Sequence, residues 1–323
     1  LVSNPTAGKG QAAAAYPRIL AGLRERGHEV VDLAGPSAGV ALARAHRATH
    51  DGSIDILTVA GGDGMVHLGV NACAQTDVPL LIAALGTGND IAANLRIPVR
   101  DELATLALLD AGTTRTVDLG HVLDDQARPW FGGVLYAGFD AVVNDRANRW
   151  RWPRGQMRYN LAVVRELPTF RPIPYAITVD GTRVETEAML VLVANATSYG
   201  GGMQVAPQAR MDDGLFDVMY LNHVSRAEFL RVFPKVFSGA HVDHPAVHLI
   251  RGRRVDLEAH GITAWADGEP LRPVPATGSL PGAWTAVRWA TRTRRSTTRT
   301  RSRRSSTSRA TATPLRSGRS RVS

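Results

Sequence analysis

Two glycine-rich segments of the chain carry carboxylates in a pattern that suits phosphate and metal chemistry. They read Gly61-Gly62-Asp63-Gly64 and Gly86-Thr87-Gly88-Asn89-Asp90. Glycines let the backbone approach a phosphate closely, and the amino end of a following helix offers free N–H groups and a positive dipole. Asp63 repels a phosphate, so beside a triphosphate its natural task is to hold Mg²⁺. Taken alone, the first loop is equally compatible with an ordinary turn between a strand and a helix.

The two best-known nucleotide motifs do not fit these segments. A Walker A loop needs G-x-x-x-x-G-K-[ST], but Gly8-Lys9 is followed by Gly10, and Ser3 stands where the first glycine belongs. The dinucleotide motif G-x-G-x-x-G fails at both loops, because Ile91 and His67 stand at its last position. A P-loop ATPase and a Rossmann dehydrogenase are therefore not supported.

A third carboxylate segment, Ala266-Asp267-Gly268-Glu269-Pro270, lies near the end of the chain. A carboxylate within hydrogen-bond reach of an acceptor hydroxyl can orient that hydroxyl and take its proton during phosphoryl transfer. Glu269 could assist by coordinating a metal or by orienting the base. Asp-Gly is also the standard two-residue hairpin loop, and the segment alone favours that simpler interpretation.

The elements that must position these loops follow an α/β pattern up to about residue 118, typical of a largely parallel sheet. One predicted strand ends at Ser3, and three others span 29–33, 54–60 and 79–83. The predicted helices span 11–26, 40–50, 65–74 and 101–110. Both glycine loops then lie at carboxyl ends of strands, where open α/β sheets bind ligands. The chain opens inside a strand, and we expect that its beginning has been trimmed.

Short strand-like runs dominate after residue 119 and predict a mostly antiparallel second domain, a sandwich. These runs span 175–179, 189–194, 216–221, 247–250, 254–258 and 262–266, with helices predicted at 140–149, 156–167 and 225–237. We place the domain boundaries at 1–118 and 119–290, followed by a tail at 291–323. The tail is rich in Arg, Ser and Thr, so it cannot bury enough surface to order itself.

Five segments in one order resemble the diacylglycerol kinase / sphingosine kinase catalytic family, particularly its soluble bacterial lipid kinases. They are Ser3-Asn4-Pro5-Thr6-Ala7-Gly8, the two glycine loops, Asp212-Asp213-Gly214-Leu215-Phe216-Asp217 and Ala266-Asp267-Gly268-Glu269-Pro270. The likeness extends to about residue 290. It implies a phosphofructokinase-like nucleotide domain, a β-sandwich domain, and an ATP-dependent kinase that transfers the γ-phosphate to a lipid hydroxyl.

The resemblance also implies roles for individual residues, with ATP and Mg²⁺ as cofactors. Asp267 would be the general base, with Glu269 beside it. A structural Mg²⁺ would take the side chain of Asp213 and backbone carbonyls of about Arg210 and Leu215, and Asp63 would hold metal beside the nucleotide. The predicted nucleotide contacts are Asn4, Gly8, Gly61, Gly62, Asp63, Gly64, Thr87, Gly88 and Asn89.

Several residues depart from the pattern of the family. Met65 stands where the family usually has Thr, which removes a hydroxyl near the phosphates. Leu68-Gly69 replaces an expected acidic residue, and Ala84 replaces a usual Pro. These changes could weaken ATP binding, but they leave Asp63, Asp213 and Asp267 in place.

Charge and composition exclude several classes of protein. The tail holds 11 Arg and no Asp, Glu or Lys, so the 38 basic residues less these 11 leave 27 against 29 acidic ones. A specific nucleic-acid partner is therefore not expected of the folded part. Cys73 is the only cysteine, which excludes internal disulfides and a cysteine zinc site. No stretch reaches the roughly 18 to 20 apolar residues of a membrane span.

Two alternatives to a lipid kinase stay open. An NAD kinase-like enzyme shares the Gly-Gly-Asp-Gly loop but pairs it with an Asn-Glu motif, whereas Asn89 here precedes Asp90. A non-catalytic nucleotide- or lipid-binding relative would fit Met65. The main interpretation places the protein in the cytoplasm, peripheral at the inner face of the membrane where its lipid lies. A homodimer is compatible with it.

Overall fold

The computed structural model describes residues 1–4, 11–123, 130–150, 152, 156–274 and 282–289. Gly8 and the predicted tail at 291–323 lie outside these residues. No helix among the described residues has the length and apolar character needed to cross a membrane. The helices are α1 (Gln11–Glu25), α2 (Ala38–His50), α3 (Asp63–Cys73), α4 (Asp90–Asn94), α5 (Glu102–Ala111), α6 (Phe139–Arg149), α7 (Gln156–Glu166) and α8 (Arg226–Val232), with 3-10 turns η2 (Phe233–Phe237) and η3 (Ala240–Asp243).

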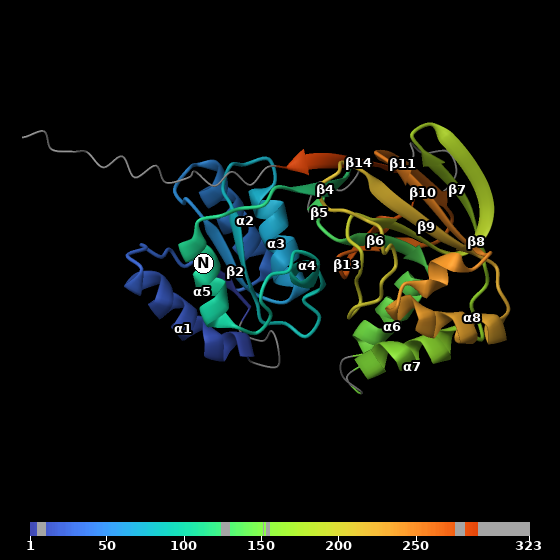
Figure 1. Ribbon diagram of the computed structural model, residues 1–323, viewed down its shortest axis with the longest axis horizontal. Helices are drawn as coiled ribbons and strands as arrows, with labels where there is room; N and C mark the ends of the chain where they lie inside the picture. Colours follow the sequence, from blue (N-terminus) through green and yellow to red (C-terminus); the bar gives the residue numbers. More distant parts are fainter. Residues whose placement is uncertain (5–10, 124–129, 151, 153–155, 275–281, 290–323) are drawn as a thin grey trace, which may run out of the picture. The chain divides into compact units, whose positions relative to one another are not determined.

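A three-stranded parallel sheet, ordered β1 (Val2–Ser3), β2 (Leu57–Gly61), β3 (Leu80–Ala84), organises the first half. Val59 packs into a cluster with α2 and α3, whereas its neighbour Ala60 packs into a second cluster with α1 and α5. Helices therefore cover both faces of the sheet (Figure 1), as a parallel sheet requires. Strands β2 and β3 lead directly into the two glycine loops.

Two sequence predictions for this half differ from the structure. The segment 29–33 was predicted as a strand and forms none, although Leu33 N donates to Leu1 O and the Leu1 amino group to Val31 O. Both of these hydrogen bonds involve Leu1, which lies outside β1. The structure also adds α4, whose five residues are too few to create a helical period.

The second half is built on an 11-stranded sheet in which every described pairing is antiparallel. Its strands are β4 (Val117–Val122), β5 (Trp130–Phe131), β6 (Val134–Gly138), β7 (Ile173–Val179), β8 (Thr182–Ala194), β9 (Phe216–Asn222), β10 (Val247–Gly252), β11 (Arg254–Ala259), β12 (Thr263–Ala266), β13 (Glu269–Pro273) and β14 (Gly282–Trp289). Strands β4, β5, β6 and β13 were not predicted. Strand β4 runs across the predicted boundary at 118, and the boundaries stay a prediction.

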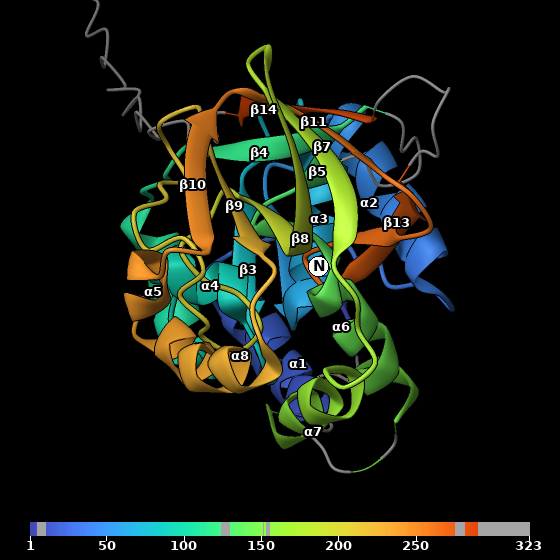
Figure 2. The same cartoon turned by 90° about the vertical axis from the view of Figure 1, so that its right-hand side faces the viewer.

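Alternate residues of β8 separate two apolar cores. Val191 and Val193 belong to a core formed among the strands, whereas Leu192 belongs to a core on the opposite face. Helices α6, α7 and α8 gather on that opposite face (Figure 2), where Phe139, Val163 and Phe229 share one cluster. The second half thus combines an antiparallel sheet with one helical layer.

Candidate functional site

A groove of about 330 Å³ runs along the two glycine loops. The loops touch so closely that a Cβ atom added to Gly86 would lie 2.3 Å from the Cα atom of Gly62. Only a residue without a side chain fits this approach, and the result is a wall made of backbone. Of the residues predicted to bind the nucleotide or act in catalysis, the groove is lined by Asn4, Gly62, Asp63, Gly64, Thr87, Gly88 and Glu269. Gly61 is the buried last residue of β2.

Asp63 begins α3 and stands at one end of this groove. Its Oδ2 accepts a 2.7 Å hydrogen bond from Asn89 N, and its Oδ1 accepts a longer one, 3.4 Å, from Ile91 N. Burial and then the charge of Asp90 raise the pKa of Asp63 to about 6. A divalent cation between Asp63 and Asp90 would relieve this unfavourable charge, because carboxylate oxygens are ligands that such ions prefer.

Asn89 holds the second loop rather than projecting into the groove. It adopts a left-handed conformation with φ of 61°, and its side chain is buried. Its Oδ1 accepts from Gly86 N at 2.9 Å, and its Nδ2 donates to Gly86 O at 2.8 Å. The contact of Asn89 with nucleotide stays a prediction, and its amide can act there by fixing the shape of the loop.

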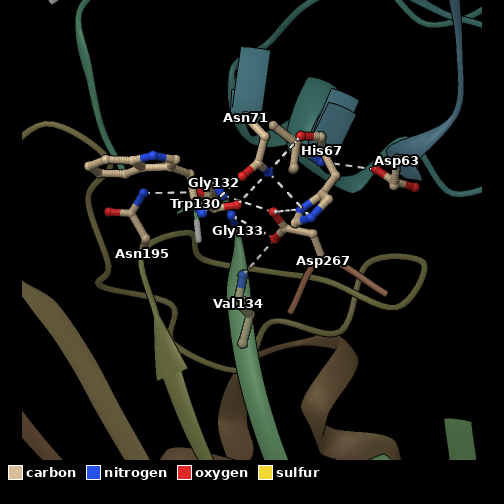
Figure 3. A network of polar contacts seen from close by, with 10 residues as sticks. Asp63, His67, Asn71, Trp130, Gly132, Gly133, Val134, Asn195 and Asp267 are labelled. Carbon is tan, nitrogen blue, oxygen red and sulfur yellow. Dashed lines mark hydrogen bonds and ion pairs between the residues drawn. The ribbon is translucent and has the colours of Figure 1, made fainter. Parts of the chain in front are cut away.

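Asp267 lies in the turn between β12 and β13 and is held by backbone donors (Figure 3). Its Oδ1 accepts from Gly133 N at 2.9 Å and from Val134 N at 3.3 Å, and its Oδ2 accepts from Gly132 N at 2.8 Å. His67 Nδ1 lies 3.4 Å from the same Oδ2, and both side chains are 1% exposed. The turn therefore ties α3, the β5–β6 connection and β12 together.

This arrangement bears on the predicted general base. Both oxygens of Asp267 are engaged, and a carboxylate needs a free lone pair to receive a proton. The contact with His67 is the longest, so it is the one that an acceptor hydroxyl could replace. His67 is in turn positioned by Asn71, whose Nδ2 donates to His67 O and to Trp130 O, and whose Oδ1 accepts from Trp130 N.

A second cavity, of about 140 Å³, meets the groove at Asp63. The carboxylates that line it are Asp63, Asp90, Asp140 and Asp267. We call it the polar cavity. Because Asp63 lines both the groove and the polar cavity, a phosphate in the first and a hydroxyl in the second would meet beside one carboxylate.

A third cavity, of about 70 Å³, continues from the polar cavity and is lined mostly by apolar side chains. We call it the apolar cavity. The two share Asp140, Tyr159 and Tyr199. Its walls come from β8 and β9 on one side and from α6, α7, α8 and η2 on the other, and include Leu192, Met203, Met219, Phe229 and Val236.

Asp140 stands where the polar and apolar cavities join. The hydroxyl groups of Tyr159 and Tyr199 both donate to its carboxylate. Burial raises the pKa of Asp140 to about 7, although the hydrogen bond from Tyr199 works against this shift. Asp140 is therefore a buried carboxyl that changes charge near neutral pH at the end of an apolar pocket.

The turn predicted to bind a structural Mg²⁺ contains Asp213, flanked by Arg210 and Leu215. Asp213 Oδ1 accepts from Leu215 N at 3.1 Å, and its Oδ2 pairs with Arg251. Arg251 Nε also lies 3.2 Å from Asp217. A metal ion here would have to share Asp213 with the guanidinium of Arg251, so this metal site stays a prediction. It lies apart from the three cavities, because none of these residues lines them.

Three residues of the site were not singled out from the sequence: Asp90, His67 and Asp140. Asp90 was readable as part of the second loop, and its carboxylate accepts 3.0 and 3.2 Å hydrogen bonds from Gly201 N. His67 and Asp140 gave no comparable signal, because their roles arise from partners 200 and 59 positions away.

Comparisons with known proteins agree with this geometry. Residues 1–122 match the diacylglycerol kinase catalytic domain, and residues 133–288 match the YegS C-terminal NAD kinase beta sandwich-like domain. The chain is 40% identical over 290 residues to a diacylglycerol kinase of Mycobacterium tuberculosis (strain CDC 1551 / Oshkosh), which covers 89% of this chain and 94% of that protein. The chain belongs to the diacylglycerol kinase family.

Other members of the diacylglycerol kinase family support the same assignment. A diacylglycerol kinase of Bacillus subtilis (strain 168) is 30% identical over 260 residues, covering 80% of this chain and 84% of that protein. A crystal structure of a diacylglycerol kinase from Bacillus anthracis str. Sterne has the same fold, with a TM-score of 0.63 and 18% identity over 89% of this chain and 93% of that one. The predicted family, fold class and activity as an ATP-dependent lipid kinase, a phosphotransferase with an alcohol acceptor, are confirmed.

Proposed function

We propose that this chain transfers the γ-phosphate of ATP to the free hydroxyl of a diacylglycerol-like lipid. The observation that carries the proposal is the continuous series of three spaces: the groove, the polar cavity and the apolar cavity. Asp63 joins the first two, and Asp140 with its two tyrosines joins the last two. The series offers places for a triphosphate, a hydroxyl and an acyl chain in the order that the reaction needs.

On the nucleotide side, the backbone of the two glycine loops would cradle the phosphates, with Asn4 and Thr87 beside them. Asp63 and Asp90 would hold Mg²⁺, because their oxygens are the ligands this ion prefers. When bound, the ion neutralises charge on the phosphoryl group in transfer. The protein's own part is to fix the phosphates against rigid loop backbone so that the terminal group points toward Asp63.

On the acceptor side, we assign the general base to Asp267. The acceptor hydroxyl would donate to Oδ2 of Asp267 in place of His67 Nδ1, and its proton would pass to that oxygen as the bond to phosphorus forms. The backbone donors from 132–134 hold the carboxylate in one orientation. Glu269 lines the groove and would act from the nucleotide side, by orienting the loop or coordinating metal.

The apolar cavity favours a lipid over NAD⁺ as acceptor. A dinucleotide has no group that needs burial among side chains such as Leu192, Met219 and Phe229, whereas an acyl chain does. A sphingoid base would fit the same cavity. We also propose that the protein is cytoplasmic and binds peripherally at the inner face of the membrane. A homodimer is compatible with this proposal.

A transfer assay with labelled ATP and Mg²⁺ tests the proposal. The acceptors are diacylglycerol, a sphingoid base, ceramide, phosphatidylglycerol and NAD⁺, each supplied separately. We expect labelled product with diacylglycerol. Transfer to NAD⁺ alone would replace the lipid kinase with an NAD kinase, and transfer to no acceptor, with ATP still bound, would leave a non-catalytic nucleotide-binding relative.

A further inference from the structure

We propose that the outward side of α7 docks on an anionic bilayer, so that the lipid passes from the membrane into the apolar cavity behind this helix. The docking surface consists of the apolar residues Met157, Leu161 and Val164 and the flanking Arg158 and Arg165, and we call it the α7 face. The inference rests on the proposed lipid acceptor, and it adds the surface by which that acceptor is reached.

The apolar residues of the α7 face are unusually exposed. Their exposed fractions are 61% for Met157, 42% for Leu161 and 58% for Val164. Met157, Leu161 and Val164 are spaced i, i+4 and i+7, so they form one stripe along the helix. Single exposed apolar residues are common on protein surfaces, whereas several in one contiguous stripe indicate an interaction site.

Basic residues accompany this stripe. Between residues 145 and 171 the chain has seven arginines and two acidic residues. Both acidic residues already pair with arginines, Asp145 with Arg149 and Glu166 with Arg146. The positive charge that remains suits the negative surface of a bilayer, where each basic residue strengthens binding. Apolar residues beside arginines on one helix are typical of interfacial membrane binding.

The opposite side of the same helix lines the apolar cavity. Tyr159 and Val163 contribute to that cavity, and Tyr159 also donates to Asp140 at its inner end. Helix α7 therefore has apolar residues on both sides, outward on the α7 face and inward on the cavity. A helix that only covered a core would need apolar residues on its inward side alone. A bilayer in contact with the outward side would bring diacylglycerol within one helix diameter of its cavity.

A second copy of the chain fits the α7 face less well. In a symmetric dimer the same patch meets itself, so the positive charges of Arg158 and Arg165 from both copies would be gathered into one interface. Like charges brought together across an interface disfavour association. A surface of anionic lipid headgroups satisfies the apolar stripe and the arginines together.

Vesicle flotation of the full chain tests the proposal without any need for turnover. The probes are vesicles of phosphatidylglycerol mixed with phosphatidylcholine, and vesicles of phosphatidylcholine alone. We expect the wild-type protein to bind the vesicles that contain phosphatidylglycerol. The triple variant Met157→Ser, Leu161→Ser, Val164→Ser should bind at least about tenfold more weakly. The double variant Arg158→Gln, Arg165→Gln should bind about 30-fold more weakly, because each basic residue near the surface contributes about fivefold and the two factors multiply.

A matched control is Leu103→Ser on α5, since Leu103 is 78% exposed and lies far from α7 in the sequence. It should bind vesicles as the wild type does. The arginine-rich tail is the same in every variant, so a difference between them comes from the α7 face. Light scattering of the triple variant checks the alternative partner, since a change from dimer to monomer would assign this surface to a second copy.

Kinetics separate the docking surface from the chemistry. With a short-chain diacylglycerol dispersed as monomers, the triple variant should keep the kcat/KM of the wild type, whereas its rate on vesicles should fall with its binding. The proposal is overturned if the wild type does not bind anionic vesicles, or if the triple variant binds them as strongly as the wild type does. A wild type that binds vesicles but phosphorylates no lipid would instead refute the proposed function.

Discussion

The groove and the apolar cavity are two sides of one site with opposite construction. The groove is walled by loop backbone, where Gly62 and Gly86 touch and Asp63 is held by the N–H of Asn89. The apolar cavity is walled by side chains from two strands and several helices, among them Leu192, Met219 and Phe229. The groove is built from backbone atoms, which every residue has, whereas the apolar cavity depends on the particular side chains that line it.

This difference indicates how the two substrates are recognised. Backbone N–H groups and a helix amino end bind phosphate whatever the neighbouring side chains are, so the proposed nucleotide side needs only glycines and the carboxylates proposed to hold Mg²⁺. Acyl chains are recognised by the shape and size of a pocket, so the acceptor side can change its lipid by changing a few side chains. The carboxylates Asp63 and Asp140 mark the two joins between these regions, and changing them tests the division.

The largest effect is expected at the join between nucleotide and acceptor. Asp63→Asn removes the charge that would hold metal beside the terminal phosphate, and kcat should fall about 10³-fold. The free energy of unfolding should change by less than about 1 kcal/mol, because burial and Asp90 already disfavour the charge of Asp63. Steady-state kinetics and chemical denaturation measure both quantities.

Asp267→Asn is the matched control for this change. Asn offers one acceptor oxygen where Asp267 offers two, and its amide group would face donors from Gly132, Gly133 and Val134. Activity should fall, and the free energy of unfolding should fall as well, by about 3 kcal/mol. If Asp267→Asn kept the stability of the wild type, the backbone hydrogen bonds from Gly132, Gly133 and Val134 would not contribute to folding as we expect.

The second prediction concerns the pH dependence of stability at the other join. Burial raises the pKa of Asp140 from 3.8 to about 7, so between these pH values the folded protein keeps a proton that the unfolded chain has lost. This contribution makes the folded state less stable as pH rises from 4 to 7, by on the order of 4 kcal/mol at most.

Asp140→Asn removes this titration while keeping the polar side chain beside Tyr159 and Tyr199. Denaturation of both proteins from pH 5 to pH 8 should give a free-energy difference that shifts toward the variant as pH rises. Asp63 has a raised pKa too, but it is present in both proteins and cancels in the difference. A difference that stays constant over this range would mean that Asp140 is ionised throughout.

The third prediction fills the apolar cavity. Val163 on α7 is buried and lines it, so Val163→Phe should occupy part of its roughly 70 Å³. The KM for a long-chain diacylglycerol should rise about tenfold, whereas the KM for ATP should not change. Overpacking should cost about 1 to 3 kcal/mol of stability, so the assay is run below the melting range. An equal rise of both KM values would indicate general distortion and contradict separate acceptor recognition.

The same division explains which parts of the site the sequence could predict. The glycine loops were predictable because their chemistry lies in consecutive backbone, with Gly61 to Gly64 directly after a buried apolar run. Most helices and strands with a clear period were predicted within a few residues, including α5 and β9. The prediction of a strand at 29–33 was wrong, although this segment exchanges two hydrogen bonds with Leu1.

The acceptor side gave no such local signal. Asp140 is one acidic residue in the first turn of α6, a common and uninformative position, until Tyr159 and Tyr199 fold against it. In the sequence His67 is an ordinary helix residue, and only the folded chain places the carboxylate of Asp267 beside it. A site made of side chains from distant segments exists only in the folded chain, whereas a site made of one loop is written in consecutive letters.

The smallest expected effect tests the nucleotide side at Met65, one of its predicted departures from the family. Met65 is buried in the core cluster that includes α2 residues and also lines the groove, and the resemblance predicts Thr at this position. Met65→Thr should lower the KM for ATP about fivefold through a hydroxyl hydrogen bond to phosphate, and lose about 1 to 2 kcal/mol of stability through the lost packing. Met65→Val is the control, because valine has the shape of threonine without the hydroxyl. If both variants bind ATP equally, the backbone of the groove sets the affinity without help from position 65, and the contrast between the two sides of the site becomes sharper.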